Sequence, residues 1–336
     1  MKAYILHAYG KGAALRLTDR PDPRPGPRDV LVRIHAAGLN QLDSKIRDGA
    51  FKPLLPYKPP LILGHDLAGT VEAVGAEVTR FAPGDRVWAR PRDGRIGTLA
   101  ERIAVDQDDL ALAPATIGMA EAASLPLVAL TAWQALVERG QVKAGDKVLI
   151  HAGSGGFGSV AIQLARHLGT RVATTASARN GAMLHDLGAE TVIDYRSERF
   201  EDRLSGYDLV ICGQEGDTLV RSLKVLRPGG RLISISGPPT QEFAQRQGLN
   251  WAMRQVMRVL SAGIRRKARA SGVHYEFLFM RADGDQLTRI AALVDQGAIR
   301  PVIDRILPFA EVNAAFTHLD TGHARGKVVV ALHPDA

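Results

Sequence analysis

A glycine-rich segment, Gly153-Ser154-Gly155-Gly156-Phe157-Gly158, has the G-x-G-x-x-G spacing that can bind a pyrophosphate. Residues 147–152 before it have the composition of a buried strand, and residues 158–168 after it have the apolar spacing of a helix. Glycines allow a tight turn and close approach of the backbone, and the first N–H groups of a helix attract negative charge. The segment predicts a dinucleotide-binding site, with a purely structural glycine turn as the alternative.

The end of the next predicted strand, residues 171–177, decides between NAD and NADP. An NAD site has an acidic residue about 20 positions after the glycines, which accepts a hydrogen bond from the ribose. No Asp or Glu occurs from Arg171 through His185. Ser177 and Arg179 are hydrogen-bond donors, and a charge-assisted bond to a 2′-phosphate contributes roughly 1.5–3 kcal/mol. The sequence favours NADPH; a solvated Arg179 at the start of a helix is the alternative.

Alternating strand and helix patterns over residues 122–280 would position these groups. The strand candidates are rich in Val, Ile and Thr, and they are residues 147–152, 171–177, 191–194, 208–212 and 231–236. The helix candidates between them are residues 158–168, 178–187 and 218–226. Such alternation predicts a parallel sheet with right-handed crossovers, which is a doubly wound Rossmann domain of the α/β class.

Residues 1–121 have a different pattern, with short β-like runs separated by glycine and proline. This pattern is typical of a compact β-barrel. After a further strand candidate at 277–280, residues 281–336 return to a strand–helix–strand pattern, which we expect to pack on the first domain. The predicted organisation is a β-barrel domain of residues 1–121 with 281–336, and a Rossmann domain of residues 122–280.

Composition restricts the class of protein. The chain has 336 residues, of which 46% are hydrophobic and 23% charged, so it can form two globular domains and is neither disordered nor fibrous. Its single cysteine, Cys212, excludes an internal disulfide and a multi-cysteine metal site. No segment has the pattern of an export signal or a membrane span. We therefore expect a soluble protein of the reducing cytoplasm.

The chain resembles the medium-chain dehydrogenase/reductase superfamily in motifs that follow the family's order from one end to the other. The matching stretches are Gly64-His65-Asp66-Leu67-Ala68-Gly69-Thr70-Val71, Gly84-Asp85-Arg86-Val87, residues 152–158, Arg227-Pro228-Gly229-Gly230 and Gly326-Lys327-Val328-Val329-Val330. The resemblance implies a GroES-like catalytic domain, a Rossmann domain, and NAD(P)-dependent hydride transfer in the cleft between them.

Zinc divides this superfamily. Zinc alcohol dehydrogenases have a catalytic cysteine where this chain has Asn40, and four cysteines for a structural zinc after the Gly-Asp-x-Val turn; both sets are missing here. Of the usual ligands His65 remains, followed by Asp66, and a zinc site needs three protein ligands. We predict no metal. An alcohol dehydrogenase with an atypical zinc site of His65, Asp66 and Asp43 stays open as an alternative.

Residues 40–47 resemble the Asn-x-x-Asp-x-Lys-x-Arg segment of the zinc-free, zeta-crystallin-like quinone oxidoreductases. This resemblance implies NADPH-dependent hydride transfer to a quinone or an α,β-unsaturated carbonyl. In that reaction Asn40 would donate a hydrogen bond to the substrate oxygen, and Lys45 would supply positive charge or relay a proton. Asp43 would orient the loop. A non-catalytic NADPH-binding protein, used for interaction or redox sensing, is the alternative from another class.

The resemblance also implies further contacts to NADP(H). Thr131 stands where the family approaches the nicotinamide, and Tyr195 joins Ser177 and Arg179 near the adenosine phosphate. The other residues that we assign to the cofactor are Cys212, Ser236, Gly237, Arg325 and Lys327.

Residues 243–275 carry seven basic residues and no acidic one, against a net charge of +8 for the chain. Apolar residues from Trp251 to Ile264 recur at helical spacing. We expect a surface helix or lid over the cleft; contact with an anionic membrane through residues 246–269 and nucleic-acid binding are the alternatives. The expected partners are a small quinone or enone and a second copy of the chain, paired through the edge segment 276–280, and no nucleic acid.

Overall fold

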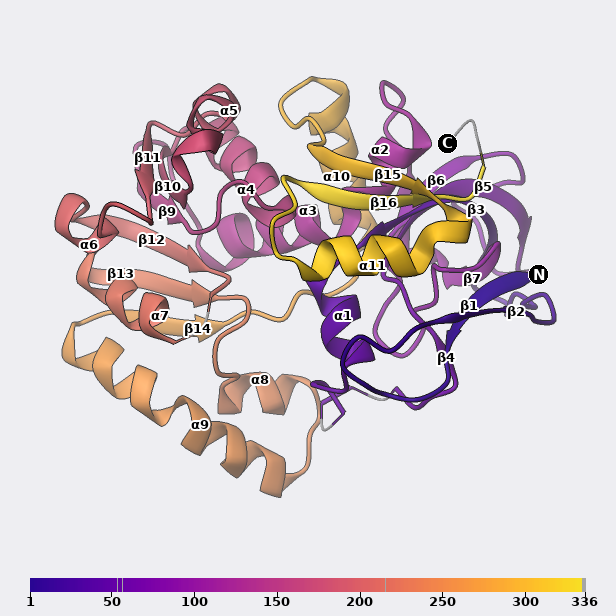
Figure 1. Cartoon of the computed structure of the whole chain (residues 1–336), viewed down its shortest axis with the longest axis horizontal. Coiled ribbons are helices and arrows are strands. Elements are labelled where there is room, and N and C mark those ends of the chain that lie inside the picture. The colour runs from indigo at the N-terminus through magenta and orange to yellow at the C-terminus, as the bar shows by residue number, and fades with distance from the viewer. Residues whose placement is uncertain (53, 56, 215, 334–336) are drawn as a thin grey trace. The chain divides into compact units, whose positions relative to one another are not determined.

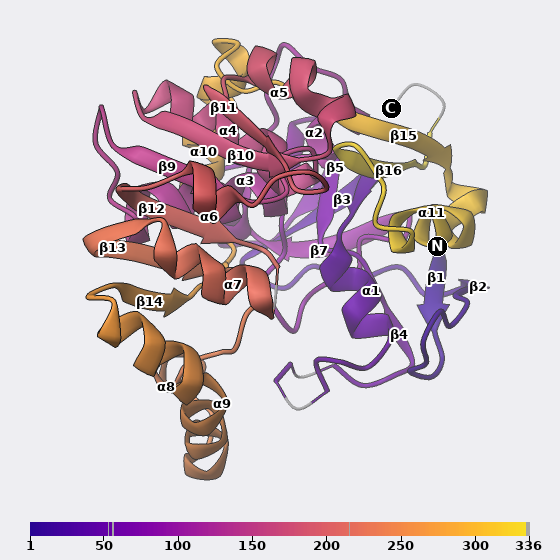
Figure 2. The same ribbon diagram turned by 60° about the vertical axis from the view of Figure 1, so that its left-hand side comes forward.

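The computed structural model describes residues 1–52, 54–55, 57–214 and 216–333. The chain divides into two compact units, drawn in Figures 1 and 2: unit 1 comprises Met1–Leu130 with Arg281–Ala336, and unit 2 comprises Thr131–Met280. The sequence placed the first boundary after residue 121. The structure places it nine residues later (130 − 121), because α2 (Met119–Ala123) packs on strands β3 and β5 of unit 1.

Unit 1 is built around the long strand β3 (Asp29–Leu39), which pairs with β5 (Asp66–Val74), β7 (Arg102–Asp106) and β16 (Lys327–Ala331). Its main sheet has the order β15-β16-β3-β5-β6-β8, and a smaller sheet has the order β2-β1-β4. The remaining strands of this unit are β1 (Lys2–Leu6), β2 (Arg16–Asp19), β4 (Leu61–Ile62), β6 (Arg86–Ala89), β8 (Leu110–Leu112) and β15 (Ile303–Pro308).

Short helices cover these sheets. They are α1 (Gln41–Arg47), α2, the first part of α3 (Pro126–Trp133), α10 (Gly284–Asp295), α11 (Val312–Asp320) and the 3₁₀ turns Gln107–Asp109 and Phe309–Glu311. One apolar core gathers β1, α1, α11 and β16, and another gathers β3, β5, β6 and β7. Because β16 is antiparallel to β3, with Val328 opposite Leu39, the expected return of the C-terminal segment to the first domain is confirmed.

Unit 2 contains a six-stranded sheet in the order β11-β10-β9-β12-β13-β14, and its strands are parallel. The order reverses between β9 and β12, so the sheet is doubly wound and the predicted Rossmann fold is confirmed. The strands are β9 (Lys147–Ile150), β10 (Arg171–Ala176), β11 (Thr191–Asp194), β12 (Tyr207–Cys212), β13 (Leu226–Ser234) and β14 (His274–Phe277).

Helices lie on both faces of this sheet (Figure 1). They are the end of α3, the π-helical segment Gln134–Arg139, α4 (Gly156–His167), α5 (Gly181–Leu187), α6 (Phe200–Arg203), α7 (Asp217–Arg221), α8 (Gln241–Arg246), α9 (Trp251–Ala270) and the 3₁₀ turns Ala178–Asn180 and Ser222–Lys224. The helix predicted at 218–226 is too long, since helical turns end at Lys224 and β13 begins at Leu226.

The strand predicted at 277–280 is wrong. Strand β14 ends at Phe277, and its residues pair with β13 from Arg231 opposite His274 to Ser234 opposite Phe277. Leu278 and Met280 are buried after the strand has ended, where the chain leads to Arg281 and unit 1. The apolar run therefore indicates that these residues are buried. Because buried residues occur both in strands and in irregular segments, the run did not give the correct position of the strand.

Candidate functional site

The glycine turn joins β9 to α4 in unit 2, as the sequence predicts. A Cβ on Gly153 would lie 2.2 Å from Thr174 Oγ1, and a Cβ on Gly158 would lie 2.5 Å from the carbonyl of Ala152, so both positions require glycine for packing. A Cβ on Gly155 would meet just the Ala152 carbonyl at 3.5 Å, an ordinary contact. No contact within the protein therefore excludes a side chain at position 155. A pyrophosphate lying against the backbone would exclude one, because its approach needs the space of the missing side chain.

Gly155 is also the N-cap of α4, and no side chain caps this helix. The first N–H groups of a helix have no partner within the helix, and they carry its partial positive charge. Gly156 and Phe157 open α4 and Ser154 stands just before its cap, so the backbone of these residues would form the predicted anion site.

The groups predicted to bind the 2′-phosphate follow the next two strands. Ala176, the last residue of β10, is paired with Asp194, the last of β11, so Ser177 and Tyr195 come to the same edge of the sheet. Ser177 is buried and accepts a 3.3 Å hydrogen bond from the Asn180 side chain, whereas Tyr195 is 59% exposed. Arg179 is exposed in the 3₁₀ turn that follows β10.

Cys212, Ser236 and Gly237 follow β12 and β13 at this carboxyl edge. Burial raises the pKa of the Cys212 thiol to about 11, and the thiol donates to the carbonyl of Gln214 at 3.1 Å. Ser236 Oγ donates to the Gly213 carbonyl at 2.5 Å, and the Gly237 N–H donates to Ser234 Oγ at 2.6 Å. These residues shape the strand ends around the predicted cofactor site.

Three assigned cofactor residues belong to other elements of the chain. Thr131 is a buried residue of α3, at the first residue of unit 2. Arg325 and Lys327 belong to unit 1, where the Arg325 N–H donates to Asp304 Oδ1 at 3.1 Å.

Lys327 lies in what we call the buried network, composed of Asn40, Asp66 and Lys327. The Lys327 ammonium donates to Asn40 Oδ1 at 2.5 Å and to Asp66 Oδ2 at 3.0 Å. Asn40 Nδ2 donates to Asp66 Oδ2 at 2.9 Å and, more weakly, to the Gly38 carbonyl at 3.4 Å. The exposed fraction is 6% for Asn40, 0% for Asp66 and 5% for Lys327. The amide that sequence reasoning offered to the substrate is engaged within unit 1.

Asp43 organises the loop beside this network. Its carboxylate accepts from the backbone N–H of Asn40 at 2.9 Å and of Gly64 at 3.2 Å, and it lies 2.6 Å from His65 Nδ1. Asp43 is the third residue of α1 and forms a capping box with Asn40. His65 is fully buried, and its Nε2 has no hydrogen-bond partner among the described residues.

Lys45 is half-buried on α1. Residues two apart on a helix do not share a face, so Lys45 and Asp43 point to different sides of α1.

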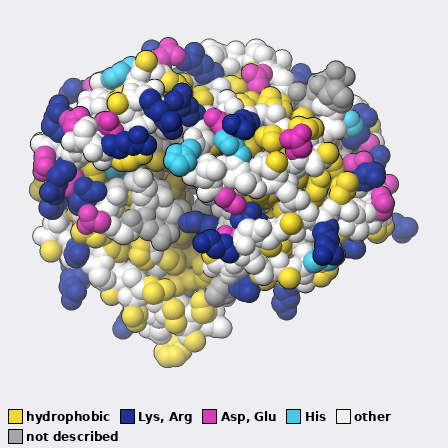
Figure 3. Space-filling view, viewed as in Figure 1, with side chains coloured by type: hydrophobic (Ala, Val, Ile, Leu, Met, Phe, Trp, Pro, Cys, Tyr) yellow, Lys and Arg dark blue, Asp and Glu magenta, His cyan; other side chains and the backbone are white. Residues whose placement is uncertain are grey.

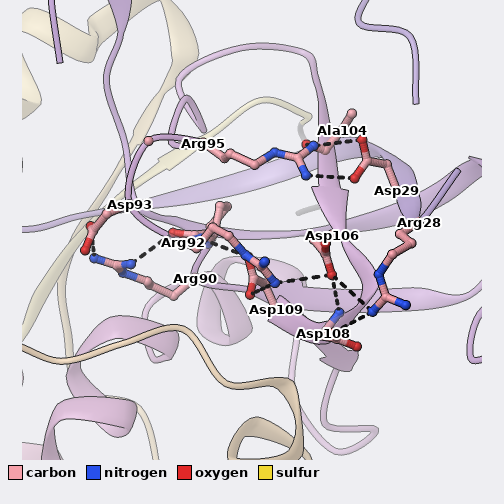
Figure 4. Close-up of polar contacts among 12 residues, drawn as sticks. Arg28, Asp29, Arg90, Arg92, Asp93, Arg95, Ala104, Asp106, Asp108 and Asp109 are labelled. Carbon is pink, nitrogen blue, oxygen red and sulfur yellow. Dashed lines mark hydrogen bonds and ion pairs between the residues drawn. The ribbon is translucent and has the colours of Figure 1, made fainter. Parts of the chain in front are cut away.

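A second polar cluster, which the sequence did not suggest, follows the Gly84–Val87 turn. We call it the arginine–aspartate network (Figure 4); its members are Arg28, Asp29, Arg90, Arg92, Asp93, Arg95, Asp106, Asp108 and Asp109. Arg95 binds Asp29 through two hydrogen bonds of 2.8 Å, and Arg92 binds Asp109 through bonds of 2.8 and 2.9 Å. The hydrogen bonds from Arg95 hold the pKa of Asp29 below its usual value. The network ties the segment after β6 to β3 and to the turn before β8.

Sequence reasoning missed the pairing of Lys327 with Asn40 and Asp66. A local signal does exist, because Lys327 opens a run of valines in a strand that must be buried. A lysine is almost never fully buried unless it is paired, so a partner could have been sought.

Two family models match the chain. One, an alcohol dehydrogenase GroES-like domain, matches residues 26–115, and the other, a zinc-binding dehydrogenase, matches residues 187–330. The mitochondrial NAD(P)H oxidoreductase RTN4IP1 of Danio rerio is 35% identical, over 100% of this chain and 92% of its own. The chain belongs to the quinone oxidoreductase branch of the medium-chain dehydrogenase/reductase superfamily. The predicted family and fold class are thereby confirmed.

Two further members of this branch show how widely it extends. A chloroplastic NADPH-dependent alkenal/one oxidoreductase of Arabidopsis thaliana is 34% identical, over 98% of this chain and 79% of its own. The solved quinone oxidoreductase of Coxiella burnetii is 32% identical, covers 99% of both chains and superposes with a TM-score of 0.85.

One of the matching family models describes zinc binding, but the residues of the buried network do not fit a zinc ion. Among the described ranges no group of three or more His, Cys, Asp or Glu side chains could hold a metal. Asp66 Oδ2 faces the Lys327 ammonium, and Asp66 Oδ1 accepts from the Leu127 N–H at 2.7 Å. A zinc ion bound to Asp66 would have to displace a buried positive charge.

Proposed function

We propose that the protein is an NADPH-dependent oxidoreductase that transfers hydride to a quinone or an α,β-unsaturated carbonyl and needs no metal ion. Membership of the quinone oxidoreductase branch supports the reaction type, and the names of its relatives include both acceptor classes. The observation that carries metal independence is the buried network. By the resemblance described above, Asn40 stands where zinc alcohol dehydrogenases have a catalytic cysteine, and the Lys327 ammonium beside it already compensates the Asp66 carboxylate.

Each unit contributes its own part to this reaction. In unit 2 the backbone around Gly155 holds the pyrophosphate, and Ser177 with Arg179 holds the 2′-phosphate. When bound, the nicotinamide supplies the hydride, and a quinone then takes up one proton from water for each hydride to become the hydroquinone. In unit 1 the contacts of Asp43 and Lys327 fix the loop that carries Asn40. In such a hydride transfer, most of the rate enhancement comes from positioning the two reactants and from excluding water from them.

The hydrogen bonds within unit 1 support a different catalytic role for Asn40 than for Lys45. Asn40 is a positioning residue in this arrangement, because its carbonyl accepts from Lys327 and its amide donates to Asp66. Asp43 is likewise a positioning residue. Lys45 keeps the role of supplying positive charge or a proton near the substrate, with its half-buried place on α1 as support.

The direct test follows NADPH and NADH oxidation by EDTA-treated protein with 1,4-benzoquinone, 9,10-phenanthrenequinone and an enone. We expect turnover with NADPH well above NADH, and Arg179→Ala should raise the KM for NADPH about tenfold or more with little change in kcat. Arg166→Ala, on α4, is the matched surface control. Activity that returns with added zinc and an alcohol would contradict the proposal, and it would make the free Nε2 of His65 a ligand.

We further propose a homodimer that works in a reducing cytoplasm. Strand β14 is a terminal strand of its sheet, so its outer edge offers N–H and C=O groups to a second copy. A single buried cysteine suits a reducing compartment. Light scattering coupled to size exclusion should give twice the mass of 36.2 kDa, and a monomer at all concentrations would overturn the dimer.

A further inference from the structure

Helix α9 has two apolar faces, and unit 2 covers one of them. Its buried residues recur at intervals of three and four: Met257, Ser261, Ile264 and Ala268. Ile264 and Ala268 belong to the apolar core of the Rossmann sheet. This face anchors the second half of α9 to its domain.

The other apolar face is exposed. Val256 is 48% exposed, Val259 72% and Leu260 60%, and Trp251 at the start of the helix is 74% exposed. At about 100° per residue, Val256, Val259 and Leu260 lie together on one side, about a third of a turn from the buried face. The exposed large hydrophobic residues of the described chain number eight, and four of them lie on this single helix. The first six residues of α9 include no buried one, so this end of the helix projects from its core.

Exposed basic side chains lie on the same helix. At about 100° per residue, Lys267 lies within the exposed apolar face, Arg266 lies at its edge, and Arg258 and Arg269 lie beyond that edge. Arg258, Arg266, Lys267 and Arg269 are exposed, and none of the four forms an ion pair within the part of the chain that the structure describes. No acidic residue occurs on α9. Figure 3 shows hydrophobic side chains gathered at the foot of the view, where Figure 1 places α8 and α9, with Lys and Arg side chains beside them.

We propose that the exposed face of α9 docks on an anionic lipid bilayer, with its apolar side chains in the boundary between headgroups and acyl chains. A helix with a strongly basic side and an apolar side lies in this boundary, and each basic residue near an anionic surface strengthens the binding. In the ranges described, no helix is both long enough and apolar enough to cross a bilayer. If the proposed function holds, the contact brings the enzyme to lipid-soluble quinones.

Charge and apolarity together favour lipid over other partners. A second copy of α9 packed on this face would bring the Lys267 and Arg266 side chains of the two copies together, and like charges repel. A nucleic acid would neutralise the arginines, but it would leave Val259 and Leu260 without an apolar partner. A bilayer with anionic lipids satisfies both sets of side chains.

The test is co-sedimentation of the full chain with vesicles of phosphatidylcholine, with and without phosphatidylglycerol, at low and high salt. We expect binding to vesicles that contain phosphatidylglycerol, weakened by salt, and a blue shift of Trp251 fluorescence that is absent in Trp251→Phe. The double variant Val259→Ser/Leu260→Ser should bind about tenfold more weakly. The triple variant Arg258→Gln/Arg266→Gln/Lys267→Gln should bind about a hundredfold more weakly. Leu112→Ser, which replaces a residue 55% exposed on β8, is the matched control and should bind like the parent.

Several results would overturn the proposal. They are failure to sediment with anionic vesicles, equal binding to pure phosphatidylcholine, and variants that bind like the parent. Binding to duplex DNA in preference to vesicles would assign the surface to nucleic acid. Self-association that the Val259→Ser/Leu260→Ser variant abolishes would assign it to a second copy. Turnover with a soluble quinone is measured separately on each variant, so failure to bind lipid is distinguishable from failure of the proposed reaction.

Discussion

The two polar networks of unit 1 use the same kinds of charged group in different surroundings. In the buried network, the Lys327 and Asp66 side chains are 5% and 0% exposed. In the arginine–aspartate network, the Arg92 and Arg95 side chains are 43% and 37% exposed, although their carboxylate partners are mostly buried. The comparison shows that pairs of opposite charges hold both networks together, and that solvent exposure decides how much each pair contributes to the free energy of unfolding.

Removing the ammonium of the buried network should have the largest effect. Lys327→Met leaves the Asp66 carboxylate buried without its cation, which should lower the free energy of unfolding by about 3–5 kcal/mol. Urea unfolding measures it. The double variant Lys327→Met/Asp66→Asn should recover much of this loss, because no charge remains unpaired. A loss below about 1 kcal/mol in the single variant would break the distinction between the two networks.

A buried imidazole in unit 2, whose hydrogen-bond partners are both uncharged, sharpens the comparison. His151 contacts Thr175 Oγ1 and Ser222 Oγ at 3.0 and 2.9 Å, and burial lowers its pKa from 6.5 to about 4. Between these two pH values the unfolded chain binds the proton and the folded chain does not. Stability should therefore fall as the pH drops from about 6.5 to 4, by up to roughly 3 kcal/mol. His151→Gln should show a shallower loss over this window in parallel urea titrations, and an identical slope would contradict the prediction.

Arg95→Gln tests the partly exposed network and should cost about 1 kcal/mol, because solvent screens a guanidinium that is 37% exposed. Added salt should reduce the difference from the parent. Since Arg95 lowers the pKa of Asp29, this contribution is present above the usual Asp pKa of 3.8 and is lost as the pH falls through the depressed value. A loss of unfolding free energy equal to that of Lys327→Met, or one that does not change with salt, would contradict the distinction between the two networks.

The smallest effect is expected at Arg28, whose hydrogen bond to Asp108 joins side chains that are 47% and 56% exposed. Arg28→Gln should change the free energy of unfolding by less than about 0.5 kcal/mol in the same urea experiment. It also serves as the control for Arg95→Gln. A clear destabilisation would mean that the network acts as one cooperative unit.

Local signals in the sequence predicted the Rossmann sheet and the glycine turn well. The strand Thr191–Asp194 has the predicted bounds, because its short apolar run lies between clear breaks. The buried network could not be read in this way, since Lys327 and Asn40 are 287 residues apart and no local pattern joins them. Periodicity found the apolar residues of α9, but it could not say that its domain covers Met257 and leaves Val259 in solvent.

The division of unit 1 into two chain segments fixes an order of events during synthesis. Strand β3 pairs with β16, and Asp66 with Lys327, through residues that leave the ribosome after all of unit 2. The Rossmann unit is therefore complete while β3 still has an unpaired edge and Asp66 has no cation. Until β16 pairs with it, this unpaired edge of β3 is the part of the nascent chain most susceptible to incorrect strand pairing.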